Sequence, residues 1–367
     1  MRRVPLSKPF INGEIRQAVL DVLDSGRFIL GPQCQEFERD LARFAGRKHA
    51  VLSSSWTAGV YLLHLAMALR AGDEVIVPSH TAFPSIEPML HCGARPAFVD
   101  IDDTYCMDPE LVEAAITPRT VGILPVHLYG HPADLDRITE IARRHDLWVI
   151  EDCAQAHGAL YKGRPVGSIG MAGAFSFYPS KNLTVLGDGG CVVTDDDAIA
   201  DRIRMLRDHG RRGKYTHEVA GFNLRFNEIQ AAAGRVGLRH LEQLNARRRA
   251  AAARYRERLA GIVGLPGEHE WATPVYHMFV IRTPRRDELA GFLKERGIET
   301  GIHYPVPNHL QPAITSIMRN LPALPRTEQA VGEILSLPIH GEIAFDDVDY
   351  VCDCIIEYAA SKQNLIS

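Results

Sequence analysis

The 367-residue sequence has no apolar run long enough to span a bilayer, and Pro5, Ser7, Lys8 and Pro9 interrupt the segment after Met1. We therefore expect neither a membrane span nor a signal peptide, and we predict a cytoplasmic protein. Basic charge is not in excess either, because the net charge is −4 and both signs are dispersed. This balance disfavours a nucleic-acid-binding or membrane-surface function.

Cysteines are few and irregularly placed. The sequence has 7 of them, and the closest pair, Cys352 and Cys354, has the wrong spacing for a redox or zinc motif. The 16 histidines include no His-x-x-Glu-His or similar pattern. We therefore predict reduced thiols and no metal site.

What the sequence does contain, between residues 48 and 194, is an alternation of short apolar runs with helical stretches. Such alternation predicts an α/β fold with a mainly parallel sheet flanked by helices. The predicted strands cover residues 50–52, 74–77, 97–99, 122–124 and 147–150, and the predicted helices cover 57–69, 84–91, 109–116 and 133–145.

The pattern changes after residue 194, where a long connecting helix and a smaller α/β unit are predicted. We therefore divide the chain into a large domain, residues 1–245 with an N-terminal amphipathic helix, and a small C-terminal α/β domain, residues 246–367. The predicted elements of these parts are helices 12–24, 195–209, 227–259, 286–296 and 346–360, and a strand at 278–281.

Polar side chains follow several predicted strands. Ligands gather at the carboxyl ends of the strands in parallel sheets, so we expect these side chains to converge on one edge. They are Ser53–Ser55, His80, Asp100, His127 and Asp152.

Lys181 and Asp152 form the most informative pair in the sequence. Asp152 closes the apolar run 147–150, and Lys181 follows the segment 175–180. A lysine that forms a Schiff base and an acid that keeps a pyridine nitrogen protonated are what pyridoxal phosphate requires. Taken alone, however, a lysine in a loop is usually a solvated charge.

Three further features are consistent with a phosphorylated aromatic cofactor. The small polar turn at Ser55 runs into a helix whose N-terminus could bind phosphate, although an ordinary N-cap is an equal alternative. Gln155 can donate to a ring oxygen, and the hydroxyl of Ser176 can reach the phosphate. The glycine-rich turn 186–190 is not a phosphate loop but a tight connection that lets the backbone pass close to the site.

The run from Glu151 to Thr194 resembles the sugar aminotransferases of the DegT/DnrJ/EryC1/StrS family, which are fold-type I pyridoxal-phosphate enzymes. The resemblance implies that Lys181 is the Schiff-base lysine and proton shuttle, and that Asp152 pairs with the pyridine nitrogen. Segments that extend the resemblance over nearly the whole chain are Ser25–Pro32, Gly72–Ser79, Val99–Asp102, Pro125–Gly130, Gly221–Arg225 and His303–Pro305.

The same resemblance implies the remaining cofactor contacts. Gln155 would contact the ring hydroxyl, and Asn223 would reach the cofactor phosphate of a neighbouring subunit, which implies a homodimer with shared active sites. The full predicted cofactor-binding set is Ser55, Trp56, Thr57, Ala58, Phe83, Asp152, Gln155, Ser176, Lys181 and Asn223.

Two positions depart from the family pattern. Trp56 stands where glycine is usual, so it either narrows the phosphate turn or adds a wall to the pocket. Ala82 stands where an aromatic residue often stacks on the pyridine ring, so either Phe83 covers the ring or another group does.

The activity that the resemblance implies is a transamination in which L-glutamate gives its amino group to a keto sugar, with pyridoxamine phosphate as the intermediate. The segment 301–312 resembles family members that aminate C3 of nucleotide-linked 3-keto-6-deoxyhexoses. A 4-keto nucleotide sugar, a keto-cyclitol and a non-catalytic regulatory role are the alternatives. Because Lys181 and Asp152 are both present, the regulatory alternative is disfavoured.

A set of substrate-binding residues completes the prediction. Arg211, Arg212, Lys214 and Arg225 could supply cations to a diphosphate, or could form a solvated loop. The predicted substrate-binding residues are Phe28, His127, Tyr178, Arg225, His303 and Tyr304.

Overall fold

A seven-stranded sheet forms the centre of the computed structural model, which describes residues 2–362. All neighbouring strands from β8 to β3 run parallel, whereas β9 is antiparallel to both β1 and β8. In spatial order the strands are β1 (His49–Ser53), β9 (Gly190–Thr194), β8 (Ala172–Ser176), β5 (Trp148–Asp152), β4 (Thr120–Ile123), β2 (Glu74–Pro78) and β3 (Arg95–Val99). The predicted α/β class and mainly parallel sheet are confirmed.

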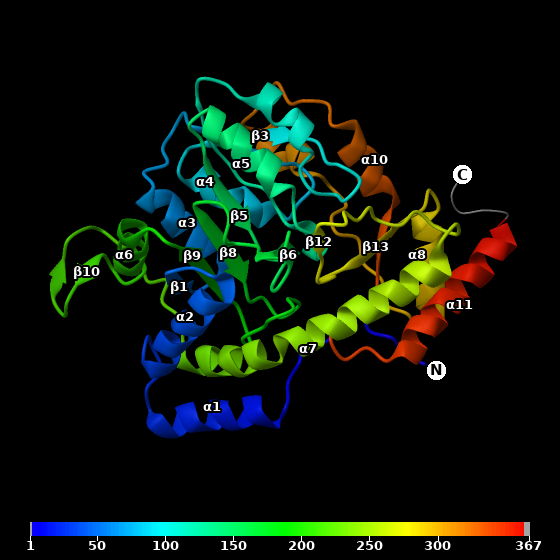
Figure 1. Cartoon of the computed structure of the whole chain (residues 1–367), viewed down its shortest axis with the longest axis horizontal. Helices are drawn as coiled ribbons and strands as arrows, with labels where there is room; N and C mark the ends of the chain where they lie inside the picture. The colour runs from blue at the N-terminus through cyan, green and yellow to red at the C-terminus, as the bar shows by residue number, and fades with distance from the viewer. Residues whose placement is uncertain (1, 363–367) are drawn as a thin grey trace.

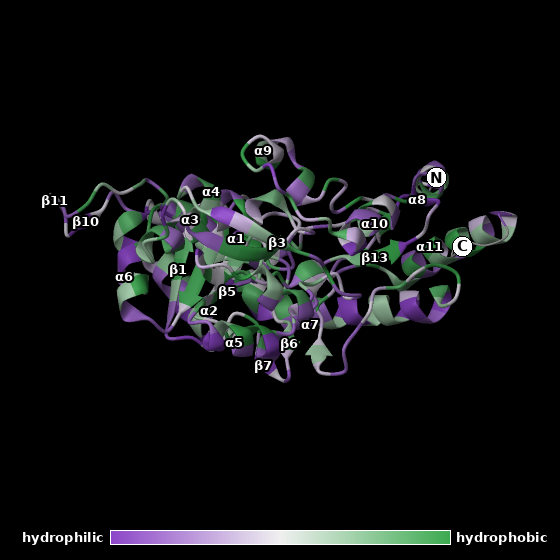
Figure 2. Ribbon diagram, turned by 90° about the horizontal axis from the view of Figure 1, so that it is seen from above, coloured by the Kyte–Doolittle hydropathy of each residue, from purple (hydrophilic) through white to green (hydrophobic). Residues whose placement is uncertain are grey.

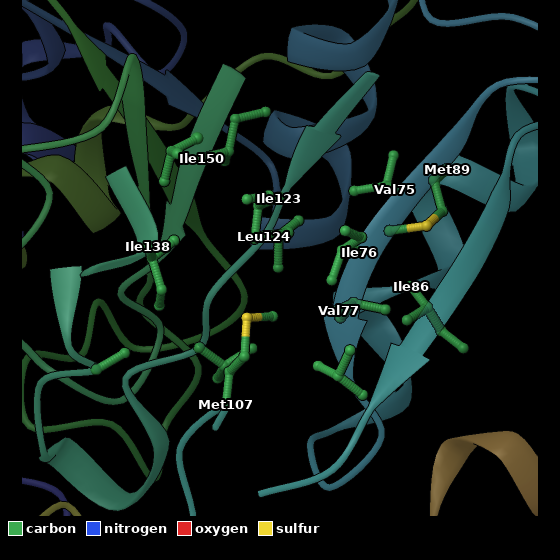
Figure 3. Packing of buried hydrophobic residues seen from close by; sticks show 14 of the residues in the cluster. Val75, Ile76, Val77, Ile86, Met89, Met107, Ile123, Leu124, Ile138 and Ile150 are labelled. Atoms are coloured by element: carbon green, nitrogen blue, oxygen red, sulfur yellow. The ribbon is translucent and has the colours of Figure 1, made fainter. Parts of the chain in front are cut away.

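The strands form because their apolar residues can be buried on both faces of the sheet. Figure 3 shows Ile76 of β2, Ile123 of β4 and Ile150 of β5 gathered with Met107 and Ile138 in the main apolar cluster. All three strand residues are fully buried. The rigid layer built in this way holds the carboxyl ends of the strands, and the polar residues after them, in fixed positions.

Helices cover this sheet, as Figure 1 shows. The predicted helices at 57–69, 133–145 and 195–209 are present, and a helix that the sequence pattern did not indicate precedes β1. Their bounds are α2 (Pro32–Ala45), α3 (Trp56–Ala66), α5 (Leu135–Arg144) and α6 (Asp197–Leu206).

Two predicted helices are not continuous. In place of a helix at 84–91 there is a 3-10 turn, Phe83–Ser85, followed by the short α4, Glu87–His91. Pro88 has no amide proton to donate to the carbonyl four residues earlier, so one helix cannot run through this segment. Residues 109–116 form two single 3-10 turns, Pro109–Leu111 and Glu113–Ala115.

The 32-residue helix α7 (Glu228–Leu259) spans the molecule lengthwise (Figure 1). One end packs against α1 (Gly13–Ser25) and α2, and the other end against α11. Its residues Ala231 and Leu241 join an apolar cluster of the large sheet, whereas Tyr255 and Leu259 join that of the C-terminal unit. The predicted boundary at residue 245 therefore falls inside α7, and the division into domains stays a prediction.

The C-terminal unit is built on a strand pair, β13 with the unpredicted β14, and on three helices. Its elements are β13 (Phe279–Arg282), β14 (Ile334–Leu337), α8 (Arg286–Glu295), α10 (Pro325–Glu333) and α11 (Phe345–Lys362). The outer helices α6 and α7 alternate between hydrophilic and hydrophobic residues in Figure 2, as expected where one helix face meets the core. No helix in the described part of the chain has both the length and the apolar character needed to cross a membrane. All seven cysteines are free thiols.

Candidate active site

A cavity of about 370 Å³ lies at the carboxyl edge of the sheet. Its lining brings together most of the predicted site residues, from segments far apart in the sequence. The predicted residues in the lining are Ser55, Trp56, Thr57, Asp152, Gln155, Ser176, Tyr178, Lys181, His303 and Tyr304.

Asp152 ends β5 and is only 3% exposed. Its carboxylate accepts hydrogen bonds from the Ala154 amide at 3.0 Å and from the Ser85 hydroxyl at 2.8 Å. Because Ser85 donates to Asp152, the 2.9 Å contact between Thr81 and Ser85 has Thr81 as its donor. Burial raises the pKa of Asp152, while the two donors and nearby Lys181 act in the opposite direction. Sequence reasoning missed Ser85, because its nearness to Asp152 depends on the break in the helix before α4.

Lys181 lies on the turn after β8, where its amide donates to the Tyr178 carbonyl at 2.8 Å. Its ammonium has no hydrogen-bond or salt-bridge partner among residues 2–362. Burial lowers the pKa of Lys181 to about 8, and nearby Asp152 partly opposes this effect. A lysine with such a pKa is partly uncharged near neutral pH, so its amine can act as a nucleophile.

The turn that we predict to bind phosphate, residues 55–57 (here called the phosphate turn), lies at the start of α3. The Ser55 hydroxyl accepts the Ala58 amide at 3.0 Å, so this side chain is the N-cap. The amides of Trp56 and Thr57 have no acceptor in the described part of the chain, and they lie at the positive end of the helix dipole. A Cβ atom on Gly190 would be 2.5 Å from the Trp56 nitrogen. Glycine at 190 therefore lets β9 pass close to the turn, as predicted.

Trp56 adds a wall to the cavity. Its indole is 6% exposed, donates to the Ala174 carbonyl at 3.1 Å, and packs with Val60 and Ala154. Ser176 ends β8 and also lines the cavity, where its hydroxyl accepts the Tyr178 amide at 3.4 Å. Of the two alternatives for Trp56, a narrower turn or an additional cavity wall, the structure shows the additional wall.

Phe83 does not line the cavity, contrary to one alternative of the prediction. Its neighbours Ala82 and Pro84 do, while Phe83 itself packs against the main apolar cluster. The 3-10 turn that directs Ser85 toward Asp152 places Phe83 on the core side. The other alternative, in which another group covers the ring face of a bound cofactor, stays a prediction.

His127 is also displaced from its predicted role in substrate binding. It is fully buried, its Nε2 donates to Glu151 at 3.2 Å, and its Nδ1 accepts the Ala133 amide at 3.0 Å. Glu151 accepts three backbone amides as well, from Gly167, Ile169 and Gly170. His127 and Glu151 therefore support β5, and through it Asp152, instead of facing the cavity.

Gln155 belongs to a network that connects the cofactor region with the loop at 303–304. Its Oε1 accepts the Tyr129 amide at 2.7 Å, and its Nε2 donates to the Tyr304 hydroxyl at 3.2 Å. The Tyr129 hydroxyl donates to the His303 carbonyl and lies 2.8 Å from Nε2 of His80. His80 and Tyr129 were not predicted as site residues, although His80 follows a strand end.

Burial makes both side chains of this loop hard to ionise. The pKa of Tyr304 is raised to about 12, and nearby Asp152 adds to the effect of burial. Burial lowers the pKa of His303 to about 4, and the charge of nearby Lys181 lowers it as well. Near neutral pH both groups are uncharged hydrogen-bonding groups in the cavity wall.

The remaining predicted residues lie outside the cavity of their own chain. Phe28 is 45% exposed and Asn223 is exposed. Arg225 donates to Asp208 at 3.0 Å, and Arg211 also pairs with Asp208. Both arginines are thus partly neutralised by Asp208, and the Arg225 side chain is only 24% exposed, so the solvated-loop alternative does not describe it.

The donors and acceptors of the cavity suit a phosphorylated pyridine aldehyde. The Lys181 amine lacks a partner, the Asp152 carboxylate can accept from a ring nitrogen, and two free amides at a helix N-terminus can bind a phosphate. The close approach at Gly190 leaves this turn unobstructed. A mainly parallel α/β sheet with such a cavity at its carboxyl edge is consistent with an enzyme that uses pyridoxal phosphate.

Comparison with known proteins identifies the family. Residues 9–356 match the DegT/DnrJ/EryC1/StrS aminotransferase family. The chain therefore belongs to this aminotransferase family.

Individual relatives agree with this assignment. The chain is 47% identical over 352 residues, 95% of its length and 93% of the relative's, to dTDP-3-amino-3,4,6-trideoxy-alpha-D-glucose transaminase of Streptomyces venezuelae. It is similar, with a TM-score of 0.93 and 45% identity, to the S. venezuelae DesV structure in complex with a ketimine intermediate, covering 98% and 99% of the chains. The PLP form of the putative sugar aminotransferase Spr1654 from Streptococcus pneumoniae has a TM-score of 0.93 at 28% identity, with 98% and 99% covered.

Proposed function

We propose that this protein is a pyridoxal-phosphate-dependent aminotransferase that moves the amino group of L-glutamate to a nucleotide-linked 3-keto-6-deoxyhexose. The observation that carries the proposal is the unpaired amine of Lys181 in the same cavity as the buried carboxylate of Asp152. The 3-amino sugar in the name of the S. venezuelae relative supports amination at C3.

Different residues of the cavity would have different roles in the reaction. Lys181 would hold the cofactor, and the Trp56 and Thr57 amides with the Ser176 hydroxyl would hold its phosphate. When bound, the cofactor supplies an electron sink for the charge that develops at the substrate carbon. Asp152 would keep the ring nitrogen protonated. Once the amino group of the donor has taken its place on the cofactor, the freed Lys181 amine, whose pKa burial lowers to about 8, would remove the proton from Cα of the donor.

The neutral side chains of the 303–304 loop suit the sugar half of the reaction. His303 and Tyr304 line the cavity together with Tyr178, so they can donate to sugar hydroxyls. No lysine or arginine other than Lys181 lines the cavity within the described residues. Cations for a diphosphate would then come from outside it. The β10–β11 hairpin, Arg211–Arg212 with Thr216–His217, projects away from the body in Figures 1 and 2.

A homodimer with shared active sites forms part of the proposal. Asn223 and the hairpin do not line their own cavity, and several large apolar side chains of the chain are exposed. These are Phe28 at 45%, Ile29 at 49%, Tyr178 at 55% and Leu186 at 42%. Burying such side chains would favour association of two chains. Light scattering that gives the mass of a monomer would contradict this part of the proposal.

The attachment of the cofactor tests the proposed function. Borohydride should fix pyridoxal phosphate on the wild-type protein, and Lys181→Ala should lose this trapping completely, because no other lysine among residues 2–362 lines the cavity. Lys162→Ala is the control, since Lys162 is an exposed residue paired with Asp136. Peptide mass spectrometry locates the label, and label retained by Lys181→Ala would place the reactive lysine elsewhere.

The substrate is tested by running the amination backwards. Nucleotide-linked 3-amino and 4-amino sugars and an amino-cyclitol are each incubated with 2-oxoglutarate, and L-glutamate is measured. We expect L-glutamate from the 3-amino sugars. Turnover confined to the 4-amino sugars or to the cyclitol would replace the proposed substrate with one of the two alternatives.

A further inference from the structure

A cluster of buried polar side chains begins one residue after Lys181. Asn182, Asn245 and His277 are each at least nine-tenths buried. The Asn182 amide nitrogen donates to the Asn245 side-chain oxygen at 2.9 Å and to the Val275 carbonyl at 3.1 Å. Its side-chain oxygen lies 3.2 Å from Nδ1 of His277.

These contacts determine the tautomer of His277. Both donor hydrogens of the Asn182 amide are used, so its oxygen is the acceptor and Nδ1 of His277 carries the proton. Nε2 is then a bare acceptor, and it has no partner in the described part of the chain. This leaves a neutral imidazole whose one donor is committed to Asn182.

The surroundings of His277 oppose a second proton. Burial holds the pKa of His277 well below its usual range, and the groups that face it from other elements act in the same direction. These groups are Lys181 on the turn after β8, Arg248 on α7, His303 on the cavity loop and His157 after β5. His277 therefore stays a neutral Nδ1 donor over the working pH range.

The cluster connects the Lys181 turn to α7 and to the segment that leads into β13. The Asn245 amide nitrogen donates to the His157 carbonyl at 2.8 Å. Arg248, one turn further along α7, donates to the carbonyls of Tyr276 and His277 at 3.1 and 3.2 Å. A Cβ atom on Gly158 would be 2.9 Å from the Asn245 nitrogen, so Gly158 packs closely against this amide.

We propose that His277 is a positioning residue for Lys181. Its Nδ1–H holds the side chain of Asn182, and Asn182 fixes the turn from which the reactive amine projects. The Lys181 ammonium has no hydrogen bond of its own to any described residue, so the position of the amine depends on its backbone. The inference rests on the role proposed above for Lys181.

A residue that only fills space would behave differently from a positioning residue. If the turn loosens, the amine gains access to water, and the pKa of Lys181 rises from about 8 toward its usual 10.5. The amine also loses its alignment with the reacting carbon, and a displacement of this kind can lower the rate about 100-fold. Since His277 does not line the cavity, KM for the keto sugar should change little.

Two substitutions separate these possibilities. The amide nitrogen of asparagine is as many bonds from Cα as Nδ1 of histidine, whereas that of glutamine corresponds to Nε2. We expect His277→Gln to lose the bond to Asn182 and to lower kcat by about tenfold or more. We expect His277→Asn to restore the donor and to recover most of kcat.

A second readout uses the cofactor-free protein. A short pulse of acetic anhydride at a series of pH values, followed by peptide mass spectrometry, gives the pKa of Lys181. This pKa should rise in His277→Gln and return toward the wild-type value in His277→Asn. His64→Gln is the matched control, because His64 is a fully buried histidine of α3 that does not line the cavity. It should lower stability without moving the pKa of Lys181.

The proposal is overturned if His277→Gln titrates and turns over like the wild type, or if the Asn and Gln variants are equally impaired. These results are separate from a failure of the proposed function. The acetylation profile reports on Lys181 whatever the protein binds, whereas borohydride trapping tests the cofactor bond itself.

Discussion

Asp152 illustrates how neighbouring groups set the chemistry of one residue. A buried carboxylate is costly in its charged form, and burial raises the pKa of Asp152. The hydroxyl of Ser85 and the amide of Ala154 compensate by donating to the carboxylate, which keeps it available as an anion for a ring nitrogen. A site residue identified by its type alone therefore depends on donors that its own sequence segment does not contain.

Replacing Ser85 tests this dependence. Ser85→Ala removes a hydrogen bond to a charged group, worth about 1.5–3 kcal/mol, so the pKa of Asp152 should rise further. We expect pyridoxal phosphate to bind about tenfold more weakly, measured by absorbance titration. Ser168→Ala is the control, because its hydroxyl donates to the Pro165 carbonyl away from the cavity. Equal affinities of the two variants would contradict the role given to Ser85.

At the scale of elements, the site is made where strand ends and a helix start come together. β5 and β8 bring Asp152 and Ser176 to one edge, and α3 presents its free amides to the same cavity. The antiparallel β9 runs between β1 and β8, and it passes the start of α3 at Gly190. The geometry of the phosphate turn therefore depends on a strand that contributes no reactive side chain.

Gly190→Ala tests this dependence. The added Cβ would lie 2.5 Å from the Trp56 nitrogen, so the turn or the strand must move. We expect a loss of about 1–3 kcal/mol in the free energy of unfolding, and weaker binding of pyridoxal phosphate because the turn is displaced. Urea unfolding and cofactor titration measure the two effects.

Gly291→Ala is the matched control for this variant. Gly291 lies in α8, and a Cβ there would meet nothing within 4 Å. Alanine should stabilise this helix by up to about 1 kcal/mol. If Gly190→Ala were as stable as Gly291→Ala and bound cofactor as the wild type does, the proposed constraint at the turn would be wrong.

For the whole molecule, the reactive lysine carries a cost in stability. In the unfolded chain its pKa returns to about 10.5, whereas in the cofactor-free fold burial lowers it to about 8. Between these pH values the unfolded state binds more protons, so Lys181 makes the fold more stable as pH rises. Below pH 8 the buried lysine lowers the free energy of unfolding by its full amount, up to about 3 kcal/mol.

Lys181→Met should remove this cost. We expect the cofactor-free variant to be more stable than the cofactor-free wild type at pH 7, by up to about 3 kcal/mol, and the difference to shrink as pH approaches 10. Urea unfolding at the two pH values measures it. Lys162→Met, at an exposed lysine, should change stability by no more than about 0.5 kcal/mol. A difference for Lys181→Met that does not depend on pH would contradict the explanation.

The sequence by itself determined the fold class and the five strands before residue 153, and it indicated Lys181 and Asp152 as candidate site residues, which line the same cavity. These follow from local patterns, because apolar periodicity and residue type are properties of short segments. Tertiary structure alone decided which side chains face the cavity. His127 and Phe83 turned away from it, and Ser85 turned toward it.

The physical reason is that burial and hydrogen-bond partners come from segments distant in sequence. His127 completes the hydrogen bonding of a buried Glu151, and His277 reaches Asn182 across 95 positions. No local pattern carries that information, because each partner is supplied by a different strand, helix or loop. The sequence thus predicts which amine is reactive, and only the assembled chain determines which residues surround it.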